Sequence, residues 1–86
     1  MHEIIATRCK YFDVFDSDKI IEVLVKTGDI FPVATVIAYI ELGDIFYISG
    51  SDEKILVRNA YPLFKSSYVY SNPNPLLDKL GSLPSF

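Results

Sequence analysis

Pro32-Val33-Ala34-Thr35-Val36-Ile37-Ala38-Tyr39-Ile40-Glu41-Leu42, with Gly43 after it, is the stretch that decides the fold class of this chain of 86 residues. Its apolar side chains recur at helical spacing: Val33, Val36, Ile37 and Ile40. Pro32 suits a first helical turn, and Gly43 suits the left-handed position just past a helix end. The β-branched side chains would also fit a long buried strand. Boundary signals and length favour a helix over residues 32–42.

Two strands are predicted before this helix. Residues 3–9 are rich in β-branched side chains, and residues 19–26 alternate between an apolar face and a mixed one, as half-buried strands do. The apolar face of the second strand consists of Ile21, Val23 and Val25. A loop over residues 11–18 joins the strands, and Thr27-Gly28-Asp29 ends the second one.

Three strands are predicted after the helix. Residues 44–49 and 54–60 fit a hairpin around the polar residues 50–53. Pro62 then breaks the pattern, because proline cannot donate to a sheet ladder. The last strand covers about residues 66–71.

A C-terminal tail follows the last strand. Asn72-Pro73-Asn74-Pro75 forces an extended or turning path. The tail then offers apolar side chains that can dock on a core: Leu76, Leu77, Leu80, Leu83 and Phe86.

These segments predict one α+β domain over residues 1–86, in the order β-β-α-β-β-β. We expect a twisted antiparallel sheet of about five strands with the helix packed on one face and the tail docked. The helix stripe should meet side chains of the sheet: Ile21, Val23, Val25, Phe46 and Ile48.

Charge and composition exclude several classes of protein. The formal net charge is −3 and the eight cationic residues are scattered singly, which argues against binding to nucleic-acid phosphates. No apolar run reaches the length of a membrane span, and the N-terminus lacks a signal-peptide pattern. Cys9 is the single cysteine, so no internal disulfide can form. A soluble cytoplasmic protein is therefore expected.

Four short motifs stand in a distinctive order along the chain: Ile4-Ile5-Ala6-Thr7-Arg8, Ile40-Glu41-Leu42-Gly43 followed by Phe46-Tyr47-Ile48, Tyr68-Val69-Tyr70-Ser71, and Asp78-Lys79-Leu80-Gly81-Ser82-Leu83-Pro84. They resemble an uncharacterised family of short proteins, the domain of unknown function numbered thirty-eight ninety-two. Its members carry Ile-Thr-Ala-x-Arg, Ile-x-x-Gly, Tyr-x-x-Thr and Asp-Asn-Leu-x-x-Leu-Pro. This chain departs from those patterns at Ile5, Ser71 and Lys79. The resemblance implies the architecture, including the helix, and no activity.

Catalytic, cofactor and metal-binding residues are not predicted. His2 and Cys9 are seven positions apart, which places them on opposite faces of one strand, so Cys9 is interpreted as a structural thiol. Asp13, Asp16 and Asp18 lack the glycine turn and the distal glutamate of a calcium loop. They are interpreted as a solvated acidic turn.

The candidate binding surface consists of Arg8, Arg58, Tyr68 and Tyr70. The arginines could anchor an anion, and the two tyrosines, which share one strand face, could stack a ligand. The structural interpretation pairs the arginines with acids such as Glu22 or Asp78 and packs the tyrosines across strands.

The leading functional hypothesis is a small non-enzymatic accessory or protein-interaction module, with a homodimer as one form. The alternative is a small-ligand or anion-binding domain that uses the four candidate residues. Catalysis through Cys9 ranks last.

Overall fold

The helix predicted from Pro32 and Gly43 is present as α1 (Val33–Glu41) in the computed structural model, which describes residues 1–11 and 16–86. Gly43 adopts the left-handed conformation, with φ at 94°, and its N–H donates to the carbonyl of Ile40 at 3.0 Å. Such a conformation favours glycine because it has no Cβ. The predicted helix is therefore confirmed, and the alternative of a long strand is wrong.

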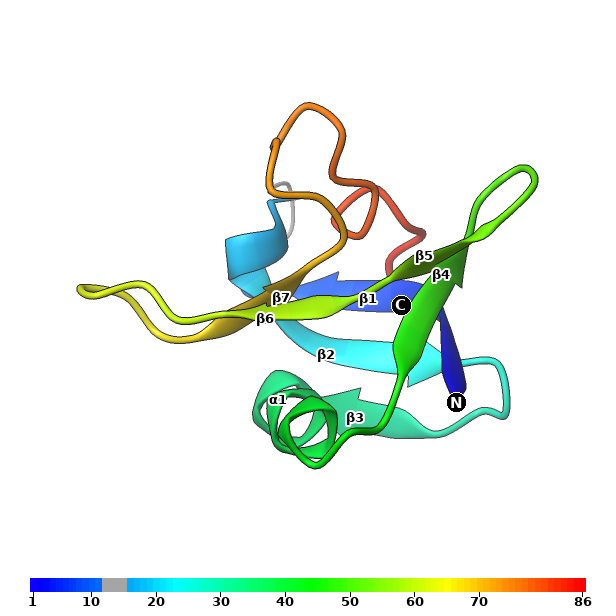
Figure 1. Cartoon of the computed structure of the whole chain (residues 1–86), viewed down its shortest axis with the longest axis horizontal. Helices are drawn as coiled ribbons and strands as arrows, with labels where there is room; N and C mark the ends of the chain where they lie inside the picture. The colour runs from blue at the N-terminus through cyan, green and yellow to red at the C-terminus, as the bar shows by residue number, and fades with distance from the viewer. Residues whose placement is uncertain (12–15) are drawn as a thin grey trace.

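Five strands form the main sheet, in the order β3-β2-β1-β4-β5 (Figure 1). They are β1 (His2–Cys9), β2 (Ile20–Val25), β3 (Ile30–Pro32), β4 (Phe46–Ser49) and β5 (Lys54–Leu56). The pairs β1–β2, β2–β3 and β4–β5 are antiparallel, but β1 and β4 are parallel. The α+β class with one helix is confirmed, whereas the prediction of an all-antiparallel sheet is wrong.

The mixed sheet follows from the position of α1. The helix starts at the residue after β3, the outer strand of the sheet, and carries the chain back so that β4 enters beside β1 in the same direction. Parallel neighbours need a crossover of a dozen or more residues, usually a helix. Strand β3 has only three residues between a turn and the helix, so alternation could not reveal it.

A second sheet pairs β6 (Arg58–Ala60) with β7 (Tyr68–Tyr70). The single strand predicted over 54–60 divides at Val57, whose N–H donates to the carbonyl of Phe46 at 2.9 Å. The chain thus pairs with β4 up to Val57 and with β7 immediately after it. A short 3₁₀ helix, η1 (Ser17–Lys19), packs against β7, and α1 contacts strands of both sheets.

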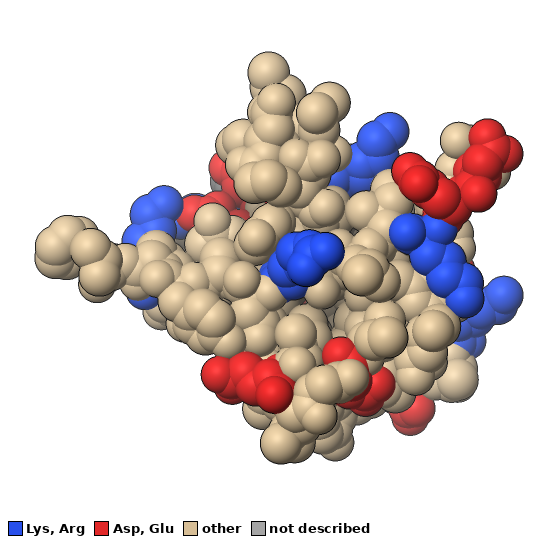
Figure 2. Space-filling view, viewed as in Figure 1, with Lys and Arg blue, Asp and Glu red and all other residues tan. Residues whose placement is uncertain are grey.

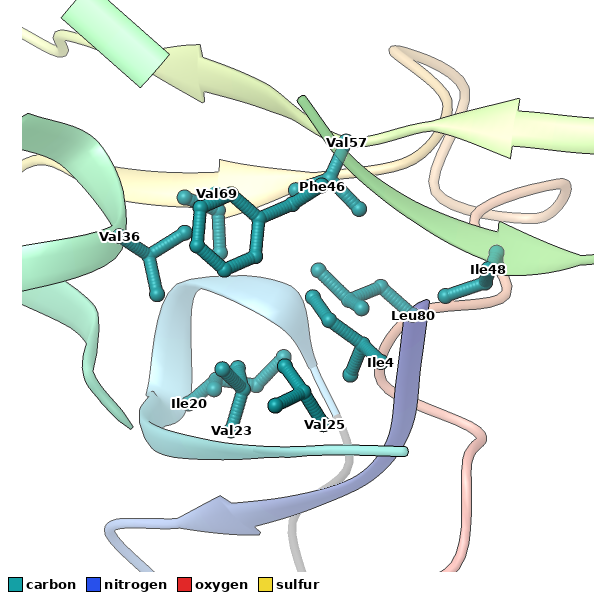
Figure 3. Close-up of a cluster of buried hydrophobic side chains, with 10 residues drawn as sticks. All are labelled: Ile4, Ile20, Val23, Val25, Val36, Phe46, Ile48, Val57, Val69 and Leu80. Atoms are coloured by element: carbon teal, nitrogen blue, oxygen red, sulfur yellow. The ribbon is translucent and has the colours of Figure 1, made fainter. Parts of the chain in front are cut away.

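The hydrophobic core combines both sheets, the helix and the tail (Figure 3). Its buried side chains are Ile4, Ile20, Val23, Val25, Val36, Phe46, Ile48, Val57, Val69 and Leu80. Phe46 and Ile48 of β4 are buried as predicted, and the helix contributes Val36 fully and the rest of its stripe partly.

The prediction that Ile21 faces the core is wrong, because its side chain is 44% exposed while that of Ile20 is buried. Arg8 pairs with Glu22 and Cys9 with Ile20, so Ile21 is the extra residue of a β-bulge. A second register shift leaves Ile5 of β1 unpaired in the same way. The bulge in β2 exposes Ile21, which regular alternation with Val23 and Val25 would have buried.

The C-terminal tail docks on β1. The N–H of Thr7 donates to the carbonyl of Pro84 at 2.9 Å, and Thr7 forms a parallel bridge with Ser85. Leu80 is completely buried and Leu83 packs against the core. Leu76 and Leu77 are exposed, so only part of the predicted apolar set docks. Among the described residues no helix is long and apolar enough to cross a bilayer.

We predict that Leu80→Ala lowers the free energy of unfolding by about 2–5 kcal/mol, because it leaves a cavity in the core. Leu76→Ala is the matched control, since Leu76 is 92% exposed, and should change stability by less than about 0.5 kcal/mol. Urea unfolding of both variants tests this. Equal effects would show that the tail does not close the core.

Candidate functional site

Arg8 forms an ion pair with Glu22 and lines neither of the two hollows described below. Its guanidinium donates to Glu22 Oε1 at 2.8 Å and, through Nε, to the carbonyl of Phe86 at 3.1 Å. The same group lies 4.6 Å from the centre of the Phe86 ring. The predicted structural pairing of Arg8 with Glu22 is confirmed. Arg8 therefore ties the end of the tail to β1 and β2.

Tyr68 and Tyr70 line an open hollow of about 560 Å³ between η1, β7 and the turn over 72–75, which we call the tail hollow. Their ring centres are 6.4 Å apart and the rings are tilted by 58°. The charged side chains around them are Asp16, Asp18, Lys65 and Asp78.

The charge of the tail hollow is opposite to what an anion needs. Of the four charged side chains that the described residues contribute to it, three are carboxylates, and the cation, Lys65, is paired with Asp18 at 3.3 Å. Neither Arg8 nor Arg58 lines it. The two tyrosines share a strand face as predicted, and Arg58 lies beside Tyr70 as its cross-strand partner, outside this hollow.

Asp78 holds the tail in place. Its Oδ1 accepts from the N–H of Ser71 at 3.0 Å, from the Ser71 hydroxyl at 2.5 Å and from the N–H of Leu80 at 3.2 Å. Its Oδ2 accepts from the Ser17 hydroxyl at 2.6 Å. With both oxygens engaged, Asp78 does not pair with Arg58, contrary to one structural interpretation of that arginine.

Lys79, the departure from the resembled pattern, contributes through its backbone. Its N–H donates to the Ser71 hydroxyl at 2.9 Å, and its carbonyl accepts from the Ser82 hydroxyl at 2.9 Å. Every residue except proline can make these two bonds, and the side chain of Lys79 lies in solvent.

Arg58 lines a second hollow of about 440 Å³ beside β6, which we call the β6 hollow. Five of its nine described lining residues are apolar, namely Ile40, Ile45, Phe46, Leu56 and Val57, and the other four are Asp44, Arg58, Asn59 and Tyr70. Ile45 and Leu56 are among the exposed large hydrophobic residues of the chain. Tyr70, the cross-strand neighbour of Arg58, borders both hollows. The four candidate residues are thus divided among three places.

The loop that joins β6 to β7 carries several exposed apolar side chains, including Phe64, the most exposed of the described large hydrophobic residues. This loop, residues 61–67, projects from the body as an arm, at the left of Figure 1. Leu63 is 91% exposed, Phe64 96% and Tyr61 58%, and the outer end of the arm is uncharged in Figure 2.

From the sequence, Tyr61-Pro62-Leu63-Phe64 is predicted only to interrupt a strand and is not predicted as a site. The available signal was three large apolar side chains in a loop, where polar residues are usual.

Cys9 has the features of a structural thiol. Burial, with a smaller contribution from the charge of Asp16, raises the pKa of Cys9 above 9.0, which disfavours the nucleophilic thiolate. His2 is engaged elsewhere: its ring stacks on Phe46 with centres 4.6 Å apart. Across residues 1–11 and 16–86, no three His, Cys, Asp or Glu side chains are grouped to hold a metal ion. Asp13, part of the predicted acidic turn, lies outside the described residues.

Asp44 anchors the start of β1. Its Oδ2 lies 2.8 Å from His2 Nε2, and its Oδ1 accepts from the N–H of Ile45 at 2.8 Å and lies 3.6 Å from the N-terminal ammonium of Met1. The hydrogen bonds from His2 and Ile45 lower the pKa of Asp44 from its usual 3.8.

Comparison with protein-family models, with curated proteins and with solved structures gave no match. The resemblance to the domain of unknown function therefore stays a prediction.

We predict that Asp78→Asn lowers the free energy of unfolding by about 1.5–3 kcal/mol, the range for hydrogen bonds to a charged acceptor. An amide keeps only one acceptor oxygen, so either the Ser71 and Leu80 bonds or the Ser17 bond is lost. Combining it with Ser71→Ala should cost less than the sum of the single changes, because the two side chains share bonds. Additive losses in urea unfolding would contradict this coupling.

We predict that Asp44 stabilises the fold above pH 3.8 and loses this effect in stronger acid. Its pKa is lower in the folded state than in the unfolded one, so the stabilisation disappears as the pH falls through the folded-state value. The stability advantage of the wild type over Asp44→Asn should therefore shrink from about pH 5 to about pH 2. Asp52→Asn, on the exposed β4–β5 turn, controls for the loss of one charge. An advantage independent of pH would refute the prediction.

Proposed function

We propose that this chain is a small non-enzymatic protein-interaction module of the cytoplasm, which binds its partner through the β6–β7 arm. The observation that carries the proposal is the near-complete exposure of Leu63 and Phe64 at the end of the arm. Single exposed apolar residues are common on monomers. Here, however, Tyr61 is exposed beside them, and clustered apolar exposure is typical of interaction sites.

The arm is held in position at its base. Val69 of β7 is completely buried, and the side-chain amide of Asn59 donates to the carbonyl of Ile37 at 3.1 Å and to the Tyr61 hydroxyl at 3.0 Å. A base fixed in this way reduces the entropy lost when the tip of the arm, Leu63 and Phe64, binds a partner. Aromatic residues are also frequent among the side chains that dominate binding energy.

The charge of the arm favours an apolar protein surface as its target. Lys65 is the only charged residue of the arm, and it is paired with Asp18 at 3.3 Å. Nucleic acid and anionic lipid both require free cations, and the net charge of −3 opposes both.

The alternative, a ligand or anion site built from Arg8, Arg58, Tyr68 and Tyr70, receives less support. Arg8 is engaged by Glu22 and Phe86, and the tail hollow that contains both tyrosines is acidic.

A photoreactive benzoylphenylalanine in place of Phe64, expressed in cells, tests the proposal. We expect a covalent adduct of defined mass from position 64, because the tip contacts the partner. The matched control carries the same residue in place of Asp52, at the exposed end of the β4–β5 hairpin, and should give no such adduct. No adduct from position 64, or the same adduct from both positions, would overturn the proposal.

A further inference from the structure

We infer that the partner of the arm is a second copy of this chain, and that the tip of each arm occupies the β6 hollow of the other copy. This inference rests on the proposed function and specifies its partner.

The tip and the hollow lie on the same stretch of chain, which allows a symmetric exchange. Arg58 and Asn59 of β6 line the hollow, and Phe64 follows five residues after Asn59, a span of about 17 Å in extended chain. A two-fold axis midway along two antiparallel arms would bring each tip to the hollow of the other copy. Such a contact is closed, so it produces a dimer and no filament.

The chemistry of the two surfaces is complementary. The tip presents Leu63 and Phe64, and the hollow presents the apolar side chains of Ile40, Ile45 and Leu56. Its volume of about 440 Å³ lies within the range of sites that enclose small molecules. The hollow can therefore receive apolar side chains of the tip.

The exposed apolar area supplies a substantial part of what a specific dimer buries. Aromatic side chains bury about 150–250 Å² each, so Phe64 at 96% and Tyr61 at 58% exposure offer on the order of 300 Å². Leu63, Ile45 and Leu56 add to this area. Each copy contributes both a tip and a hollow, and a standard interface buries about 800 Å² per partner. The two aromatic side chains alone provide more than a third of that requirement.

The charge of the chain predicts how salt affects the dimer. Each copy carries a net charge of −3, so long-range electrostatics opposes association while apolar burial favours it. Added salt screens the repulsion, and the dimer should become tighter. An interface that depended on exposed ion pairs would weaken instead.

Sedimentation equilibrium of the full chain tests the inference. We expect a wild-type dimer whose dissociation constant rises at least about 30-fold in the Leu63→Ser/Phe64→Ser variant, the change expected when a dominant contact is lost. Leu56→Ser, in the hollow, should weaken it in the same direction. Leu76→Ser is the control, since Leu76 is equally exposed but lies on the tail. Thermal unfolding should show that all three variants stay folded.

A disulfide experiment tests the geometry. In a Cys9→Ser background, Phe64→Cys protein mixed with Leu56→Cys protein should form the mixed disulfide under mild oxidation, whereas Phe64→Cys mixed with Leu76→Cys should not. A monomeric wild type, or a dimer that tolerates both the tip and the hollow substitutions, overturns the inference. If position 64 then cross-links to a different protein, the proposed function stands and only the second-copy partner falls.

Discussion

The docking of the C-terminal tail depends on the hydrogen bonds that the carboxylate of Asp78 accepts. This carboxylate binds the backbone and hydroxyl of Ser71 at the end of β7 and the N–H of Leu80 in the tail. These bonds fix Leu80, which is completely buried. A domain of this size buries only about 60% of the surface that its unfolded chain exposes. The stabilisation contributed by one core leucine is therefore a large fraction of its free energy of unfolding.

Local features of the fold could be predicted from the sequence, and long-range ones could not. The helix ends are determined by Pro32 and Gly43, residues whose backbone preferences act within one turn. The exposure of Ile21 depends on a bulge in the pairing of β1 with β2, and alternation within one strand contains no information on such a bulge. The parallel pairing of β1 with β4 depends on where α1 returns the chain. No local pattern determines that return.

In the candidate site, too, local features could be predicted from the sequence and long-range ones could not. Tyr68 and Tyr70 share a face because they are two residues apart on β7, which alternation predicts. Arg58 pairs with Tyr70 in the second sheet, whereas Arg8 lies on β1 of the main sheet, so only the separation of Arg8 from the tyrosines follows from topology. The acidic character of the tail hollow arises because η1 packs beside β7, a contact between segments some fifty positions apart. At the tip, the sequence predicts only a break in a strand at Pro62 and does not predict that Leu63 and Phe64 are exposed.

Substitutions at the tip and in the β6 hollow differ in how much they change the free energy of unfolding. Leu63 and Phe64 are as exposed in the folded chain as in the unfolded one, so polar substitutions there change the free energy of unfolding little. The inner wall of the hollow includes Phe46 and Val57, which belong to the core. Substitutions on that wall would disturb folding together with the proposed binding. The proposed binding can therefore be tested apart from folding at the tip and at the outer rim of the hollow, where Leu56 lies, but not at its inner wall.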